Sequence, residues 1–275
     1  MTKRAEIALS RREFGLVTGG FLISGVASGC QGQGSGRQRS EARLTARPSA
    51  TKTTWAAGTY ALGLAGARDA FLQVPADAGD GPLPVLVLFH GAGGSAERFL
   101  RRLATATEAL RIVIVATDSR GRTWDVIPGE QGTLLDIVTG HRRSAGFGAD
   151  VAFLDRALER VFQKVSVDPA CIAVGGFSDG ATYALSLGLI NGDLFQRIVA
   201  FSPGFIVEGE PRGRPQVFVS HGRADEILPI DRCSRRIVPA LQKRGYAVTF
   251  REFDGGHEMP EALAREAIRW IMGGA

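Results

Sequence analysis

The sequence predicts an α/β protein in which helices cover both faces of a mostly parallel sheet. From about residue 55 onward, strand-like apolar runs alternate with amphipathic, helix-like segments. Several strands, such as PVLVLFHG at 84–91, are apolar without interruption, which is typical of strands buried on both faces. With 275 residues, 44% of them hydrophobic and 22% charged, the chain is long enough for one sizeable core or two small ones.

The expected elements follow one another without an internal repeat. GTYALGLAG at 58–66 and AFLQVP at 70–75, separated by a turn, predict an antiparallel start. The later strands are expected at 84–91, 111–118, 171–177, 197–204, 216–222 and 247–255, and the helices near 95–110, 147–164, 181–190, 231–244 and 260–272. In such sheets ligands meet the carboxyl ends of the strands.

The net charge of +5 and the pI near 9.5 raise the question of nucleic-acid binding, so the location of the charges matters. Residues 1–54 carry nine Lys/Arg and three Asp/Glu, whereas residues 55–275 carry 24 and 25. The basic excess therefore belongs to the N-terminal region, and no basic block resembles a nucleic-acid footprint. The sequence predicts no nucleic-acid partner.

The N-terminal region looks like an export signal. Residues 10–14, SRREF, resemble a twin-arginine motif, and the weakly polar stretch 15–27 is too short to span a bilayer. Residues 27–30, ASGC, resemble a bacterial lipobox, although Ala27 stands where leucine is usual. We expect residues 1–30 to be a twin-arginine-type signal peptide and Cys30 to be lipidated, which would anchor the protein to a membrane in the periplasm or at the cell surface. An uncleaved N-terminal helix or a disordered start is the alternative.

Residues 31–54 predict a flexible linker. They are rich in Gly, Ser, Gln and Arg and offer little apolar surface to bury. The catalytic domain is therefore expected to begin near Trp55 and to occupy residues 55–275.

The stretch CIAVGGFSDG at 171–180 supplies a candidate nucleophile, Ser178. An apolar strand runs into a G-x-S-x-G sequence, and a helix rich in small residues follows. Gly176 and Gly180 leave room for a sharp strand-to-helix turn, which would hold Ser178 at its tip with the hydroxyl exposed. A glycine-rich turn with a bystander serine is the alternative reading of the motif alone.

The rest of the chain offers an acid and a base for this serine. In α/β-hydrolases the acid and then the histidine follow the nucleophile, which leaves His221 and His257 among the four histidines. Asp225 follows the strand that ends near His221, at the carboxyl end where an orienting carboxylate belongs, and His257 comes later in the loop FDGGHEMP. This spacing predicts a triad of Ser178, Asp225 and His257.

Other carboxylates fit the role of the acid less well. Asp254 is too near His257 in sequence, and Asp231 is expected to cap a helix. Glu258 could compete as a local partner of His257.

Five segments, taken in order, carry a resemblance to a known family. They are HGAGG at 90–94, DVAFLDRAL at 150–158, GFSDGA at 176–181, HGRADEILP at 221–229 and GGHE at 255–258. Because of these segments and their order, the chain resembles the α/β-hydrolase superfamily over most of residues 58–272. Within that superfamily it resembles the group of small carboxylesterases, phospholipases and polyhydroxybutyrate-depolymerase-like esterases. The resemblance implies the α/β-hydrolase fold and the triad given above, with His90 and His221 as loop-ordering histidines. The short connection 205–215 predicts no separate cap domain.

Acyl transfer also needs hydrogen-bond donors for the oxyanion. One is expected to be the backbone N–H of Asp179, the residue after the nucleophile. The other resembles the residue after the His-Gly pair at the end of the early strand, Ala92, with Gly93 as its neighbour.

The sequence predicts neither a cofactor nor a metal. It contains no metal-ligand spacing and no P-loop. Cys171 and Cys233 are expected to be free, because the first starts its strand and the second follows the end of another, at opposite edges of the sheet.

Together these features predict an exported serine hydrolase, carboxylesterase-like, that cleaves small-molecule or polymeric carboxylic esters through an acyl-enzyme on Ser178. A peptidase, a thioesterase or an acyltransferase could use the same triad. A surface lipoprotein that keeps the fold only for binding is the alternative from another class.

The lipobox predicts that Cys30→Ala releases the protein from membranes, since the substitution removes the only lipid attachment that the leader implies. Membrane and soluble fractions of cells that express either form would be compared by immunoblot. If both forms fractionate alike as soluble protein, the lipobox interpretation is wrong.

Overall fold

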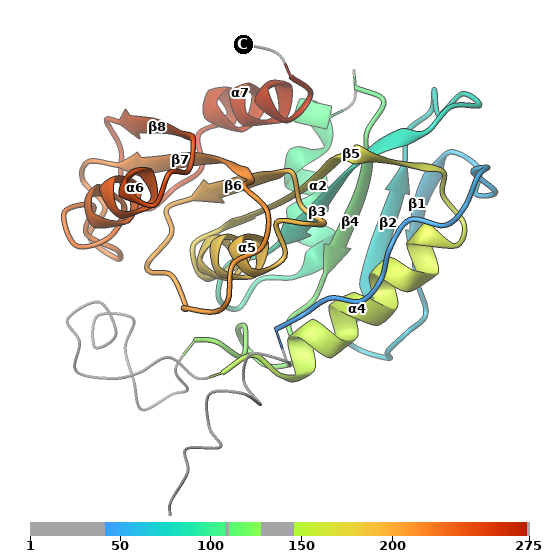
Figure 1. The fold of residues 1–275 in the computed structure, drawn as a ribbon, viewed down its shortest axis with the longest axis horizontal. Helices are drawn as coiled ribbons and strands as arrows, with labels where there is room; N and C mark the ends of the chain where they lie inside the picture. Colours follow the sequence, from blue (N-terminus) through green and yellow to red (C-terminus); the bar gives the residue numbers. More distant parts are fainter. Residues whose placement is uncertain (1–41, 108–109, 128–145, 274–275) are drawn as a thin grey trace, which may run out of the picture. The chain divides into compact units, whose positions relative to one another are not determined.

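The computed structural model describes residues 42–107, 110–127 and 146–273. Within these ranges the chain forms an eight-stranded sheet with helices on both faces (Figure 1). The α/β fold class predicted from the sequence is confirmed. The expected signal peptide, Cys30 and the first residues of the expected linker lie outside the described residues.

The elements appear in the predicted order. The strands are β1 (Gly58–Ala61), β2 (Ala70–Val74), β3 (Leu83–Phe89), β4 (Val113–Thr117), β5 (Val167–Phe177), β6 (Arg197–Phe201), β7 (Gln216–Gly222) and β8 (Val248–Phe253). The helices are α2 (Ala96–Thr107), α4 (Ala149–Phe162), α5 (Asp179–Ile190), α6 (Ser234–Lys243) and α7 (Glu261–Ile271).

The sheet is parallel except at one edge. Its strand order is β1-β2-β4-β3-β5-β6-β7-β8, in which β2 pairs antiparallel with both β1 and β4, and the remaining pairs are parallel. The predicted antiparallel start is therefore confirmed. Because the other strands all run the same way, their carboxyl ends gather at one edge of the sheet, where the loops after β3, β5, β7 and β8 meet.

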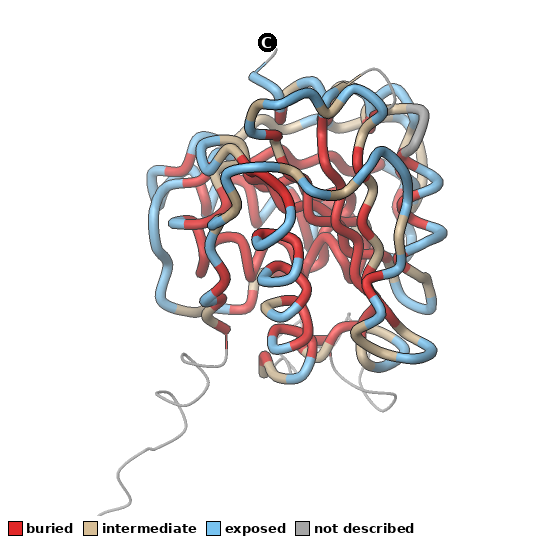
Figure 2. The backbone as a smooth tube through the Cα atoms, turned by 90° about the vertical axis from the view of Figure 1, so that its right-hand side faces the viewer, coloured by how far each residue is buried: buried red, intermediate tan, exposed pale blue. Residues whose placement is uncertain are grey.

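Alternate residues of the central strands face opposite layers. In β3, Val85, Val87 and Phe89 join the cluster that contains the buried faces of α4, α5 and α6, whereas Leu86 and Leu88 join the cluster that contains α2 and α7. Figure 2 shows the buried strands enclosed between more exposed outer segments. The uninterrupted apolar sequence of β3 follows from this two-sided burial.

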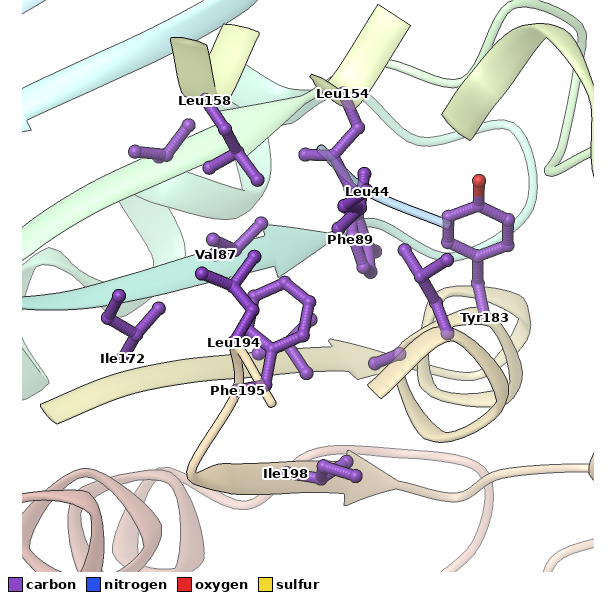
Figure 3. Close-up of a cluster of buried hydrophobic side chains, with 14 of the residues drawn as sticks. Leu44, Val87, Phe89, Leu154, Leu158, Ile172, Tyr183, Leu194, Phe195 and Ile198 are labelled. Atoms are coloured by element: carbon purple, nitrogen blue, oxygen red, sulfur yellow. The ribbon is translucent and has the colours of Figure 1, made fainter. Parts of the chain in front are cut away.

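The larger cluster holds the sheet and α4 together. Figure 3 shows Val87 and Ile172 from neighbouring strands facing Leu154 and Leu158 of α4. Each such side chain is almost fully buried. Burying an aliphatic side chain of this size contributes about 1.5–3 kcal/mol, so the cluster is a main source of the stability of the fold.

Residues 42–54 correct the predicted linker. They do not form a tether: Ala42, Leu44 and Ala46 are buried in the main cluster, and the folded domain begins well before Trp55. The alternation of small or apolar residues with Arg43, Thr45 and Arg47 is that of an extended segment with one buried face, although its overall composition is polar.

Polar contacts fix this segment along its length. The Leu44 N–H donates to Asn191 Oδ1 at 2.9 Å, and the Asn191 amide donates back to the Ala42 carbonyl at 2.9 Å. Arg43 and Arg47 both pair with Asp193, at 3.0 and 2.7 Å. The segment therefore closes over the end of α5, and Leu44 reaches the core beside Phe89 and Leu154 (Figure 3).

The connection between β6 and β7 holds no helix. Residues 202–215 run as a loop that buries Phe205 and Val207 and forms one isolated bridge, between Gly192 and Gly213. Within the described residues the chain thus has no separate cap domain, as predicted. None of the helices among the described residues is both long and apolar enough to cross a membrane.

Leu44→Ala should destabilise the protein by about 2–4 kcal/mol, because the side chain is only 2% exposed and its loss leaves a cavity. Urea unfolding followed by circular dichroism would measure the change. Lys52→Ala is the matched control, since Lys52 belongs to the same segment and is exposed. Equal unfolding midpoints for the two variants would contradict the packing of residues 42–54 on the core.

Candidate active site

Ser178 lies on a sharp turn between β5 and α5. Its φ of 58° and ψ of −120° fall outside the regions that a serine ordinarily adopts, at a cost of about 1–3 kcal/mol. The turn is held on both sides: the Ser178 N–H donates to the Phe201 carbonyl at 2.9 Å, and the Ser178 carbonyl accepts from Ala181 and Thr182 at 3.0 Å each. The surrounding hydrogen bonds thus fix the serine in a strained conformation.

The two glycines of G-x-S-x-G make this turn possible. A Cβ on Gly180 would lie far inside contact distance of the Phe89 and His90 carbonyls at the end of β3. A Cβ on Gly176 would collide with the Gly180 carbonyl in the same way. The first turn of α5 therefore sits directly against β3, as the sequence predicted for a tight strand-to-helix turn.

The structure brings Ser178, His257 and Asp225 into one hydrogen-bonded chain. His257 Nε2 lies 2.8 Å from Ser178 Oγ, and His257 Nδ1 lies 2.7 Å from Asp225 Oδ2. Ionised Asp225 can only accept, so Nδ1 carries the ring proton and Nε2 is free to accept the serine proton. This is the arrangement of a nucleophile, a general base and an orienting acid.

Asp225 is buried and fully occupied as an acceptor. Its Oδ1 accepts from the backbone N–H groups of Ile227 and Leu228, at 3.0 and 2.8 Å. Burial alone would raise the pKa of Asp225, but hydrogen bonds from His221 and His257 outweigh burial and hold the pKa well below its ordinary value. The acid is therefore ionised at neutral pH.

His221 contacts Asp225 in addition to ordering its loop, which is the role that the sequence predicted. Its Nε2 donates to the Leu228 carbonyl at 2.7 Å, which orders the loop as predicted, but it also lies 3.2 Å from Asp225 Oδ2. Ser234 Oγ donates to His221 Nδ1 at 2.6 Å, which fixes this tautomer. His221 and Ser234 thus position the acid, and nothing in the sequence motif pointed to Ser234.

His90 lies apart from the hydrogen-bonded chain and orders the loop after β3. Its Nδ1 donates to the Gly91 carbonyl at 2.7 Å, and its Nε2 accepts from the Ser119 N–H at 3.2 Å. The indole of Trp124 donates to the His90 carbonyl at 2.8 Å. Burial lowers the pKa of His90, so the ring is neutral at neutral pH.

The backbone N–H groups of Ala92 and Asp179 have no acceptor among the described residues. Their neighbours do have one: the Gly93 N–H donates to the Arg122 carbonyl and the Gly94 N–H to the Gly91 carbonyl, both at 3.0 Å. A Cβ on Gly91 would come within 3.4 Å of Ser178 Cβ, so this loop lies against the nucleophile. Two unused donors therefore stand in segments that adjoin Ser178.

The competing carboxylates lie elsewhere. Asp254 pairs with Arg223 at 2.6 Å, and Asp231 pairs with Arg235 at 2.8 Å. Asp231 does not cap α6, whose N-cap position is Cys233 without a side-chain hydrogen bond. The His257 Nδ1 is bonded to Asp225 and has no bond to Glu258.

A cleft of about 530 Å³ opens beside the hydrogen-bonded chain. Its walls are the neighbours of the three residues, not the residues themselves. The lining residues are His90, Gly91, Ala92, Gly94, Ser95, Arg98, Phe99, Arg101, Arg102 and Phe177. Phe177 precedes Ser178, and its ring lies 4.9 Å from the His257 ring, centroid to centroid. The cleft thus reaches the place where a group bound at Ser178 would extend.

The two cysteines of the described chain form no disulfide, as predicted. Cys171 and Cys233 are both free, and burial raises the pKa of the Cys233 thiol to about 12. Among the described residues no group of three or more His, Cys, Asp or Glu side chains could hold a metal ion. His141 lies outside the described residues.

The sequence matches the protein family described as Phospholipase/Carboxylesterase over residues 76–272. A curated relative is a candidate esterase, NocK of Nocardia uniformis subsp. tsuyamanensis, which is 27% identical over 153 residues. This alignment covers 54% of the chain and 42% of NocK, so the chain spans less than half the length of that relative.

Two solved esterases are similar in fold. Esterase PE8 superposes on this chain with a TM-score of 0.58 at 22% sequence identity. The superposition includes 73% of this chain and 97% of the PE8 chain. The carboxylesterase of Bacillus cereus superposes with a TM-score of 0.55 at 20% identity and covers 76% of this chain and 95% of its own. The family match over residues 76–272, together with these similarities in fold, confirms the resemblance to α/β-hydrolase esterases that the sequence showed.

Proposed function

The chain belongs to the phospholipase/carboxylesterase family, and we propose that it is a serine hydrolase that cleaves carboxylic esters through an acyl-enzyme on Ser178. The observation that carries the proposal is the hydrogen-bonded chain from Asp225 through His257 to Ser178, with Ser178 held on a strained turn. A bystander serine in a glycine-rich turn would need neither the strained backbone nor a histidine oriented by a buried carboxylate.

The reaction divides into two acyl transfers. Ser178 Oγ attacks the ester carbonyl carbon while His257 Nε2 takes its proton, and the resulting imidazolium is stabilised by Asp225. The tetrahedral intermediate collapses as His257 returns the proton to the leaving alcohol. Water, activated by His257 in the same way, then releases the acid and restores Ser178.

The oxyanion of each intermediate is assigned to the backbone N–H groups of Ala92 and Asp179. Both are without a protein acceptor, and both belong to segments beside Ser178. In a serine protease, removal of one preorganised oxyanion donor raises the activation free energy by about 2.7–4 kcal/mol.

The proposal extends to the location of the protein. Export by the twin-arginine route and lipid attachment at Cys30 rest on the leader motifs alone. They imply that the substrate is met outside the cytoplasm and that the membrane is contacted only through the lipidated N-terminus.

Ser178→Ala and His257→Ala should each lower kcat by on the order of 10⁴-fold or more on a short-chain aryl ester, and the double variant should lose little beyond either single one. The reason is that the two residues act as one unit. Steady-state kinetics would measure the losses, with folding checked by circular dichroism.

The assignment of the acid is tested by Asp225→Asn against Asp254→Asn, which is the matched control. Asp225→Asn should lower kcat by roughly 10²–10⁴-fold, because an amide at this position favours the wrong imidazole tautomer. Asp254→Asn should stay within about twofold, because this side chain is exposed and paired with Arg223. If Asp254→Asn is the more damaging change, Asp225 is not the acid.

A further inference from the structure

The cleft beside Ser178 carries an unusual charge. Ten residues line it, and those charged at neutral pH are three arginines, Arg98, Arg101 and Arg102, with no carboxylate among the lining residues. These arginines are spaced i, i+3 and i+4 along α2, which places them on one face of the helix. The opposite face, with Leu100 and Leu103, is buried.

Two of the arginines already have partners within the protein. Arg101 pairs with Glu97 at 2.6 Å, one turn earlier on the exposed side of α2. Arg102 donates to the Met259 carbonyl at 3.1 Å and stacks over Phe177 at 5.8 Å from its ring centroid. Both are therefore tied to the wall of the cleft.

Arg98 has no such partner. Among the described residues its guanidinium makes no hydrogen bond and no ion pair, and only its backbone N–H bonds, to Ser95 Oγ. Arg98 lines the same cleft as His90, Gly91 and Ala92, and after burial its positive charge is among the influences that lower the pKa of His90. Arg98 thus combines five free donors with a position inside the cleft.

From this we propose that the cleft binds an anionic group of the substrate and that Arg98 recognises it. The enzyme would prefer esters that bear a carboxylate or a phosphate beside the scissile bond over neutral esters of the same size. Planar guanidinium groups bind both anions through paired hydrogen bonds. Phe99 and Phe177 would contact the apolar part that joins the anion to the ester. The inference rests on the proposed function, since it names the substrate class of that same site.

The test measures the hydrolysis of matched ester pairs by the full-length protein. On the acid side, 4-nitrophenyl hydrogen glutarate is paired with 4-nitrophenyl valerate, and on the alcohol side, carboxymethyl butyrate is paired with ethyl butyrate. In each pair one ester has a carboxylate where the other has a methyl group. We expect wild type to prefer the anionic ester in at least one pair, by kcat/KM, and that pair shows which side of the ester enters the cleft.

Arg98→Gln should lower this preference by about tenfold, mainly through a higher KM for the anionic ester. Arg98→Lys should retain part of it, because the charge remains while the paired hydrogen bonds are lost. Higher salt should reduce the wild-type preference, since the site is open to solvent. Arg160→Gln is the control, because Arg160 is an exposed arginine on α4, which packs on the other face of the sheet, and it should leave the ratio unchanged.

The outcomes separate this inference from the proposed function. If wild type hydrolyses the neutral esters but prefers the anionic partner in neither pair, or if Arg98→Gln changes the preference no more than Arg160→Gln does, the anion site is wrong while the serine hydrolase stands. If wild type hydrolyses none of the four esters although it is folded, the proposed function fails, and the anion site falls with it.

Discussion

The close approach of α5 to β3 is the constraint on which the rest of the site depends. Only a glycine at position 180 lets the first turn of the helix rest on the Phe89 and His90 carbonyls, and only a glycine at 176 lets the strand enter the turn. This contact holds Ser178 in its strained conformation and sets the Asp179 N–H beside it. It also places the loop after β3, with Ala92, against the nucleophile, so one packing requirement assembles both the nucleophile and the expected oxyanion donors.

The parallel sheet supplies the other half of the site. Because β5, β7 and β8 are parallel, the loops after β7 and β8 end at the same edge as the turn after β5. Asp225 and His257 are therefore brought close to Ser178 by the parallel arrangement of the strands, although they lie far from it in sequence. What fixes them is local: His221, Leu228 and Ser234 hold the acid, and the acid in turn holds the His257 ring.

The fold and the three residues of the triad could be predicted from the sequence. The packing of residues 42–54 and the roles of Ser234 and Arg98 could not, for physical reasons. The apolar runs predicted the strands, and the glycines around Ser178 predicted the sharp turn, because both are local features of the sequence. The family order of serine, acid and histidine then pointed to Asp225 and His257 as the other two residues of the triad. The linker prediction is wrong for residues 42–54, because their polar composition gave no sign of their contacts with the buried Asn191 and the exposed Asp193, which lie far away in sequence. The roles of Ser234 and Arg98 could not be predicted because they depend on the folded structure. Ser234 contacts His221, and Arg98 lines the cleft beside Ser178.

Covalent labelling tests whether Ser178 is a nucleophile that His257 activates. The folded protein would be treated with a fluorophosphonate and the labelled peptide identified by mass spectrometry. We expect one adduct per chain, on Ser178, and loss of labelling when His257 is replaced by alanine. A folded protein that remains unlabelled, or that carries its adduct on another residue, would contradict this expectation.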